Sequence, residues 1–136
     1  MIQVINGIKG SGKTKRIIDM ANQSIKDSKS DVLFVDDDNR YMFDLRHEIR
    51  FINAGEFGIR GPEMFLGFLC GLLAQNFDVG IIFIDAFLKL VKTDLQQAQW
   101  FFERMDQLCQ RHQVTFVLSV SADTEDLPEF LLKYVI

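Results

Sequence analysis

The sequence has few of the residues that stabilise disulfide-rich or metal-dependent domains. Its two cysteines, Cys70 and Cys109, lie far apart and form no C-x-x-C pair, which excludes a disulfide framework and a four-cysteine zinc site. Both lie among apolar residues, and we expect them to be buried free thiols. Two prolines and nine glycines in 136 residues are too few for a collagen-like or linker-like chain.

Long apolar runs and an excess of basic charge are also missing. The longest apolar stretch, Met64–Ala74, is interrupted by glycines and is shorter than the ~20 residues that a membrane helix needs. The N-terminus lacks the features of a signal peptide, so we expect a soluble cytoplasmic protein without membrane contact. Fifteen basic against nineteen acidic residues give a net charge of −4, which leaves no basic field to hold nucleic acid.

The sequence does contain an alternation of apolar strand-like segments and helix-like segments. A length of 136 residues is typical of one domain, and we expect a single domain over residues 1–136. The alternation predicts an α/β fold in three layers, with helices around a mainly parallel sheet of about five strands. Strands are predicted at 2–6, 32–35, 49–53, 81–85, 114–120 and 134–136, helices at 13–27, 62–76, 93–112 and 126–133, and a loop at 55–61.

The most informative segment is Gly7–Thr14, GIKGSGKT, which matches the pattern G-x-x-x-x-G-K-[ST]. Its glycines let the backbone fold closely around phosphate oxygens, and backbone N–H groups at the start of the following helix then form an anion-binding nest. A chance glycine-rich turn is the alternative, but the position between a strand and a helix argues against it. The predicted nucleotide-binding residues are Gly7, Lys9, Gly10, Ser11, Gly12, Lys13, Thr14 and Lys15.

Within this segment, Lys13 has the position of a side chain that contacts the β- and γ-phosphates, and the Thr14 hydroxyl has that of a Mg²⁺ ligand. Lys9 and Lys15 either increase the local positive field or are ordinary solvated lysines. A second motif, IIFID at residues 81–85, ends a fully apolar strand in a carboxylate. We expect this strand to lie beside the loop, where Asp85 would hold Mg²⁺. The alternative is that Asp85 caps the next turn.

With these two motifs the sequence resembles the P-loop NTPase superfamily, with Gly7–Thr14 as Walker A and Ile81–Asp85 as Walker B. The segment GIKGSGKTKRIIDMAN, with VDDDNRY further on, also resembles a family of small bacterial proteins labelled ATP-binding or twitching-motility-like. The resemblance implies a three-layer α/β/α P-loop NTPase fold that binds Mg²⁺ and ATP at the carboxyl ends of its strands. It also implies catalytic roles for Lys13 and Asp85 and metal binding by Thr14 and Asp85.

The chain departs from the superfamily where a catalytic base is expected. Many P-loop ATPases have a glutamate directly after the Walker B aspartate, and this chain has Ala86. A base could come from Asp36, Asp37 or Asp38, which follow the second strand, although an acidic turn in solvent is the alternative. Ser121, at the end of the strand after helix 93–112, is a candidate sensor of the γ-phosphate or a helix cap.

The guanine-recognition pattern Asn-Lys-x-Asp is missing, and its nearest match is Val91–Asp94, VKTD. ATP is therefore the expected nucleotide rather than GTP, by elimination. Arg46, Arg50 and Arg60 are candidates for contact with a γ-phosphate in this subunit or a neighbouring one, and surface ion pairing is the alternative for each.

Three functions remain open from the sequence. The first is a slow ATPase or nucleotide-dependent switch that acts with a partner, either a second copy of the chain or another protein. The second is a small-molecule phosphotransferase of the nucleoside-kinase type, in which residues 53–61 would form the substrate lid. The third is a non-catalytic nucleotide-binding module.

Overall fold

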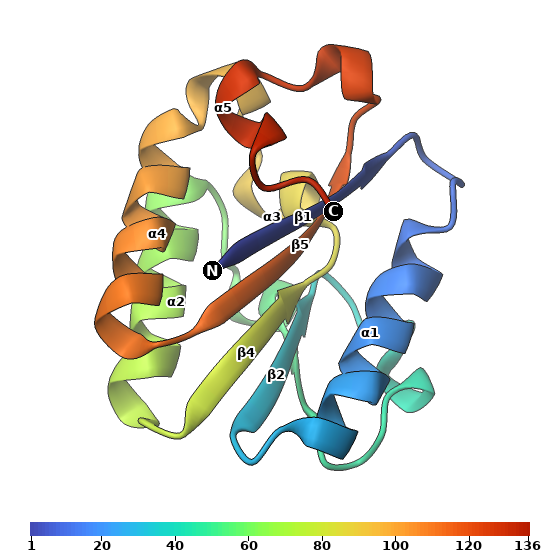
Figure 1. The fold of residues 1–136 in the computed structure, drawn as a ribbon, viewed down its shortest axis with the longest axis vertical. Coiled ribbons are helices and arrows are strands. Elements are labelled where there is room, and N and C mark those ends of the chain that lie inside the picture. The colour runs from blue at the N-terminus through green and yellow to red at the C-terminus, as the bar shows by residue number, and fades with distance from the viewer.

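The computed structural model describes all residues, 1–136, and contains one five-stranded sheet flanked by helices (Figure 1). The strands are β1 (Ile2–Gly7), β2 (Asp31–Asp36), β3 (Arg50–Asn53), β4 (Val79–Ile84) and β5 (Thr115–Ser121). The helices are α1 (Lys13–Asp27), α2 (Pro62–Gln75), α3 (Phe87–Val91), α4 (Gln99–His112) and α5 (Glu129–Leu132). All neighbouring strands are parallel, which confirms the predicted α/β class.

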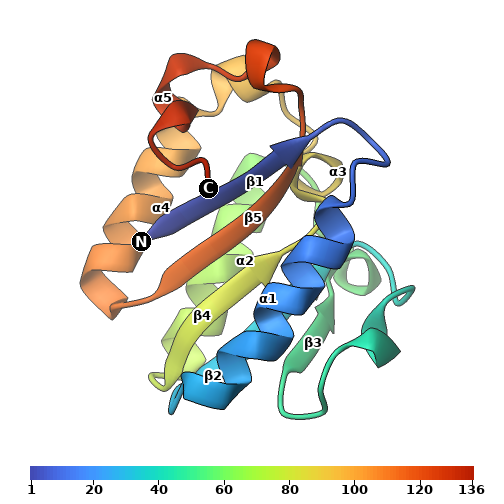
Figure 2. The same ribbon diagram turned by 45° about the vertical axis from the view of Figure 1, so that its right-hand side comes forward.

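The elements form three layers, with α1 on one face of the sheet and α2 and α4 on the other (Figure 2). The helical spacing of Ile17, Ile18 and Ala21 places them on the inner side of α1, where they are buried against the sheet. On the opposite face, side chains of α2 and α4 form a larger core that includes five buried phenylalanines: Phe65, Phe87, Phe101, Phe102 and Phe116. The sheet is therefore covered on both faces, as parallel sheets require.

The strand order is β1-β5-β4-β2-β3. The strand that ends in Asp85 was expected beside the loop, and Asp85 does lie there, within hydrogen-bond distance of Thr14, although β5 separates β4 from β1. The register still aligns the carboxyl ends of all strands: Gly7 pairs with Ser121, and Asp36 pairs with Asn53. The segments after the strands therefore meet at one edge of the sheet, where α/β folds bind their ligands.

The helix predicted over residues 93–112 is wrong in its first part. A short helix, α3, precedes it, and the Asp94 side chain caps a separate 3₁₀ turn, Leu95–Gln97, by accepting a hydrogen bond from the Gln96 N–H. α4 begins only at Gln99. The apolar spacing nevertheless continues through the 3₁₀ turn, because Leu95 and the inner side of α4 pack into the same core.

Two further segments differ from their predictions. Residues 55–61, expected to be a loop, begin within a 3₁₀ helix, Ala54–Phe57, whose Ala54 is fully buried. Residues 134–136, expected to be a strand, form only a single bridge, between Val135 and Val4. The N–H of Val4 donates to the Tyr134 carbonyl at 2.8 Å, and its carbonyl accepts from the Ile136 N–H at 3.0 Å. The C-terminal residues therefore lie along the middle of β1 (Figure 1).

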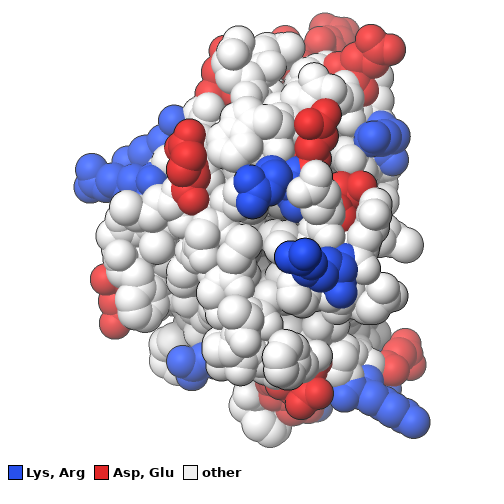
Figure 3. Space-filling view, turned by 90° about the vertical axis from the view of Figure 1, so that its left-hand side faces the viewer, with Lys and Arg blue, Asp and Glu red and all other residues white.

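Helix α2 is apolar on both its inner and its outer side. Phe65, Leu69 and Leu73 are buried against the sheet, while the outer side carries Gly67, Gly71 and other small or apolar residues. Glu63 in the first turn is the one charged residue of the helix. Figure 3 shows the face that bears α2 and α4, where uncharged atoms form a broad area interrupted by separate acidic and basic side chains.

Candidate nucleotide-binding site

The segment Gly7–Thr14 folds as a tight turn from β1 into α1. Gly10 and Gly12 have φ angles of 83° and 93°, in the left-handed region that favours glycine. Gly12 is the N-cap of α1, and no side chain satisfies the first N–H groups of the helix. These free N–H groups and the positive end of the helix dipole make the start of α1 suitable for binding an anion.

The turn is closed by bonds to one carbonyl group. The Ile8 carbonyl accepts hydrogen bonds from the Ser11 N–H at 3.1 Å and from Lys13 Nζ at 3.0 Å. Gly7 packs against the Ser11 side chain so closely that a Cβ atom there would collide with the hydroxyl. The Lys13 ammonium group therefore lies at the loop itself. From there it can replace its hydrogen bond to the Ile8 carbonyl with one to a phosphate oxygen.

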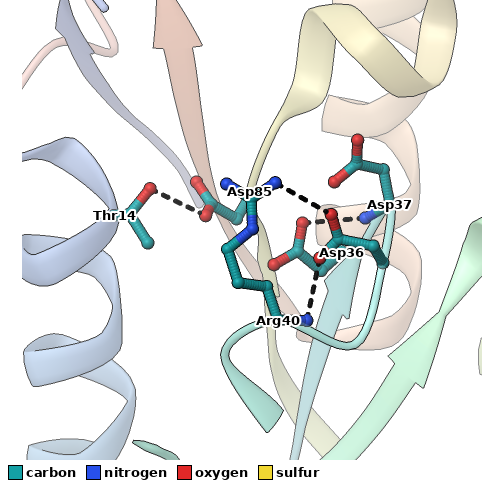
Figure 4. Close-up of polar contacts among 6 residues, drawn as sticks. Thr14, Asp36, Asp37, Arg40 and Asp85 are labelled. Carbon is teal, nitrogen blue, oxygen red and sulfur yellow. Dashed lines mark hydrogen bonds and ion pairs between the residues drawn. The ribbon is translucent and has the colours of Figure 1, made fainter. Parts of the chain in front are cut away.

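Thr14 and Asp85 meet directly, although they are 71 positions apart (Figure 4). The Thr14 hydroxyl donates to Asp85 Oδ2 at 3.0 Å, and the Ser119 hydroxyl of β5 donates to Asp85 Oδ1. Ser119 also accepts a hydrogen bond from the Ala86 N–H at 3.1 Å. Asp85 is 5% exposed, so two hydroxyl groups from different elements fix the orientation of an almost buried carboxylate.

A second buried carboxylate lies at the end of β2. Asp36 is 2% exposed; its Oδ1 accepts the Asp37 N–H at 2.7 Å, while its Oδ2 is buried without a partner. Burial raises the pKa of Asp36 to about 8, and hydrogen bonding to the Asp37 side chain and the nearby negative charge of Asp85 act in the same direction. An unpaired buried oxygen costs free energy unless a ligand or a proton satisfies it, and the raised pKa of Asp36 favours the proton when no ligand is bound.

The acidic run continues to Asp38, which holds a basic side chain at the edge of the cleft. The Arg40 guanidinium lies 3.5 Å from Asp38 Oδ2, and the Arg40 backbone N–H donates to Asp38 Oδ1 at 2.9 Å. The Arg40 guanidinium also lies over the Tyr41 ring, 5.8 Å from the centroid. The turn after β2 therefore contributes carboxylate groups and also one guanidinium group to the site.

These elements enclose a cleft of about 560 Å³ at the carboxyl edge of the sheet. It is lined by most of the residues predicted from the sequence: Lys9, Gly10, Gly12, Lys13, Thr14, Lys15, Asp36, Asp38, Asp85 and Ser121. Gly7 and Ser11 do not line it, because they form the base of the turn. Lys15 also pairs with Asp19 at 3.0 Å on the exposed side of α1.

The cleft lining also includes Arg40, Lys89 and Ser119, to which sequence reasoning assigned no role. Ser119 was detectable in principle, because it lies two residues before Ser121 and side chains two apart on a strand share a face. Lys89 had no sequence signal, since its position depends on α3. Arg46, Arg50 and Arg60 do not line the cleft, and Arg46 lies 3.4 Å from Glu48.

The donor set is suited to magnesium. Thr14 offers a hydroxyl oxygen and Asp85 a carboxylate, and Mg²⁺ prefers hard oxygen ligands supplied by one or two carboxylates, water and phosphate. The unpaired oxygen of Asp36 adds a further oxygen donor in the same cleft. The side chains present therefore fit a Mg²⁺ ion bound together with phosphate oxygens.

No protein-family model matches the chain, and no curated protein matches it. Among solved structures, it is similar to the flagellar accessory protein FlaH from Methanocaldococcus jannaschii, with a TM-score of 0.57 and 16% sequence identity. The similarity covers 97% of this chain and 65% of FlaH, so the chain spans slightly less than two thirds of the FlaH length.

At this level of identity the similarity shows the fold alone. Together with the five-stranded parallel sheet, it shows a distant P-loop-like α/β fold for this chain. Separately, no helix of the structure has both the length and the apolar character needed to cross a membrane.

Proposed function

We propose that the chain binds ATP with Mg²⁺ in the cleft and works as a slow ATPase or nucleotide-dependent switch that acts through a partner. The proposal depends mainly on the 3.0 Å hydrogen bond between Thr14 and Asp85. Two separate motifs predicted these residues as metal ligands, and in the folded chain their oxygen atoms are adjacent.

Each residue has a defined task in this proposal. The loop N–H groups and Lys13 neutralise phosphate charge, while Thr14 and Asp85 would hold the metal, which supplies further positive charge to the phosphates when bound. Ser119 keeps Asp85 in position. Catalysis in such a site consists mainly of positioning and electrostatic stabilisation, with little covalent chemistry by the protein.

Slow turnover is supported by the identity of the residue after Asp85. Ala86 has no group to polarise water, and its φ of 56° turns the chain directly into α3. The remaining carboxylates of the cleft come from the turn after β2, and Asp38 is engaged by Arg40. A partner, either a second copy or another protein, would supply the missing group and make hydrolysis depend on association.

A small-molecule phosphotransferase is the second candidate. It is supported by a smaller pocket that adjoins the nucleotide cleft and shares Asp37 with it. In that case Asp37 would bind the acceptor hydroxyl, and the 3₁₀ turn Ala54–Phe57 would form part of the acceptor site rather than a mobile lid.

Calorimetric titration with Mg·ATP and Mg·GTP tests the binding proposal. Wild-type protein should bind ATP more tightly than GTP, and Lys13→Ala should weaken ATP binding about 100-fold, because it removes the charged hydrogen bonds to phosphate. Lys26→Ala, at the far end of α1, is the matched control and should bind as wild type. Equal ATP affinity in the wild type and Lys13→Ala contradicts the proposed site.

Radiolabelled ATP then separates the functions. Slow release of free phosphate supports the ATPase or switch, and label on an added metabolite supports the phosphotransferase. Binding without turnover supports a non-catalytic module.

A further inference from the structure

A second pocket, of about 420 Å³, adjoins the nucleotide cleft. The two share Asp37 and Lys89, which therefore form the wall between them. The rest of the second pocket comes from the turn that includes Gly55 and Gly58 and from the end of α3. Its volume lies within the range of ~300–1,000 Å³ that is typical of small-molecule sites.

Three basic side chains line this pocket: Arg60, Lys89 and Lys92. All four ion pairs of the structure join other residues, so none of the three is neutralised by a carboxylate at ion-pairing distance. This concentration of unpaired positive charge occurs in a chain with a net charge of −4. Cations that line a concave site attract anions and raise their local concentration.

The backbone around these side chains is firmly placed. Leu90 and Val91 are buried in the core, which anchors α3 between Lys89 and Lys92. Lys92 is the C-cap of α3, and its left-handed φ of 51° and the bond from its N–H to the Leu88 carbonyl fix where its side chain leaves the helix. On the opposite wall, a Cβ atom at Gly55 would lie 2.5 Å from the Asp37 carbonyl oxygen, so the turn packs tightly against the acidic run.

We propose that the pocket formed by Arg60, Lys89 and Lys92 binds a small phosphate monoester beside the bound nucleotide. A phosphate group carries close to two negative charges, which matches three cations better than a monocarboxylate does, and Arg60 can form a bidentate pair with it. Asp37 is the one carboxylate of the lining and lies on the side shared with the nucleotide cleft. A hydroxyl group of the ligand would bind there, so the ligand is a hydroxylated phosphate monoester.

This inference rests on the proposed nucleotide site, and the experiment separates the two. Wild-type protein is first saturated with Mg²⁺ and a non-hydrolysable ATP analogue, so that the phosphate loop is filled. It is then titrated by calorimetry with glycerol 3-phosphate, inorganic phosphate and, as a monocarboxylate, acetate. We expect a second binding event with glycerol 3-phosphate and a weaker one with inorganic phosphate.

The variants identify the pocket. Lys92→Gln and Arg60→Gln should each weaken glycerol 3-phosphate binding about tenfold without changing affinity for the ATP analogue, since neither residue lines the nucleotide cleft. Lys29→Gln is the matched control and should have no effect, because Lys29 lies in the turn after α1. Equal binding by wild type and Lys92→Gln, equal binding of acetate, or no second event overturns the inference.

A failure of the proposed nucleotide site gives a different result from a failure of the proposed phosphate pocket. If the analogue itself does not bind, the same titration is made on nucleotide-free Lys13→Ala, in which the loop ammonium is absent. Binding that still depends on Arg60 and Lys92 would then support the anion pocket alone, and binding that does not depend on them would overturn it.

Discussion

Asp85 is held by hydroxyl groups on both of its oxygen atoms, which bears on the proposal that it is a metal ligand. Replacing it with alanine leaves the Gly7–Thr14 turn intact but removes the carboxylate beside Thr14. We expect Asp85→Ala to weaken ATP binding at least about tenfold in the presence of Mg²⁺ and much less in EDTA. Calorimetric titration under both conditions measures the difference, and equal losses would mean that Asp85 is purely structural.

Asp36 should make the stability of the unliganded protein depend on pH. Its pKa is about 8 in the folded chain and near 3.8 in the unfolded chain, so between these values the folded state binds one more proton. The contribution of Asp36 to the free energy of unfolding is therefore greatest below about pH 4. It falls as the pH rises towards 8, by up to ~1.4 kcal/mol per pH unit. Above about pH 8 the loss is complete.

The isosteric variant Asp36→Asn isolates this effect. Asparagine keeps an oxygen that can accept the Asp37 N–H, but it does not ionise. The free energy of unfolding of the variant should therefore not show the fall with rising pH that Asp36 causes. Urea unfolding of both proteins at several pH values between about 5 and 8, without metal, gives the comparison. Parallel curves for the two proteins would show that Asp36 does not titrate in this range.

At the scale of the secondary-structure element, α2 contains two glycines in the middle of a helix. A Cβ atom at Gly67 or Gly71 would meet nothing within 4 Å, and both positions are exposed. We expect Gly67→Ala and Gly71→Ala each to raise the free energy of unfolding by about 0.5–1 kcal/mol, because alanine restricts the unfolded chain more than glycine does. Urea unfolding tests this, with Gly55→Ala as a contrast that should destabilise because of its contact with Asp37.

The elements also show how far the sequence could be interpreted. β1, α1 and the strand before Asp85 were predictable, because motif, spacing and apolar pattern agree in each. α3 was not, since its five residues are too few for a periodic signal and its start requires a left-handed Ala86. Because α3 was not predicted, the position of Lys89 in the cleft could not be predicted either. The order of the strands was not readable either, because no local pattern specifies which strand lies beside β1.

The positions of the candidate site residues were easier to predict from the sequence than the contacts that surround them. The Gly7–Thr14 segment and Asp85 belong to local motifs, and each has a position fixed by the strand before it. The contacts made by Ser119 and Arg40 are long-range or depend on the turn after β2, so they emerge only in the folded chain. The raised pKa of Asp36 likewise results from burial, which an acidic run in a sequence does not indicate.

At the scale of the whole molecule, the cleft is built from α1 on one face of the sheet and from segments that come after β2 and β4. A ligand in it therefore links parts of the chain that are distant in sequence. Mg·ATP at about 100 times its dissociation constant should stabilise the protein by about 2.7 kcal/mol and raise Tm by several degrees. Scanning calorimetry should show this shift in the wild type and a much smaller one in Lys13→Ala at the same ATP concentration, whereas an equal shift in both would place ATP elsewhere.

The two edge strands of the sheet, β1 and β3, differ in whether other residues already bond to their outer backbone groups, and this limits where a further strand can pair. Val4, halfway along β1, already has both of its outward backbone groups bonded by Tyr134 and Ile136. β3 pairs only with β2 and carries no such cover. An added strand can pair with this sheet without displacing native residues only beside β3, Arg50–Asn53. This holds for an engineered strand and for an insertion in a longer relative.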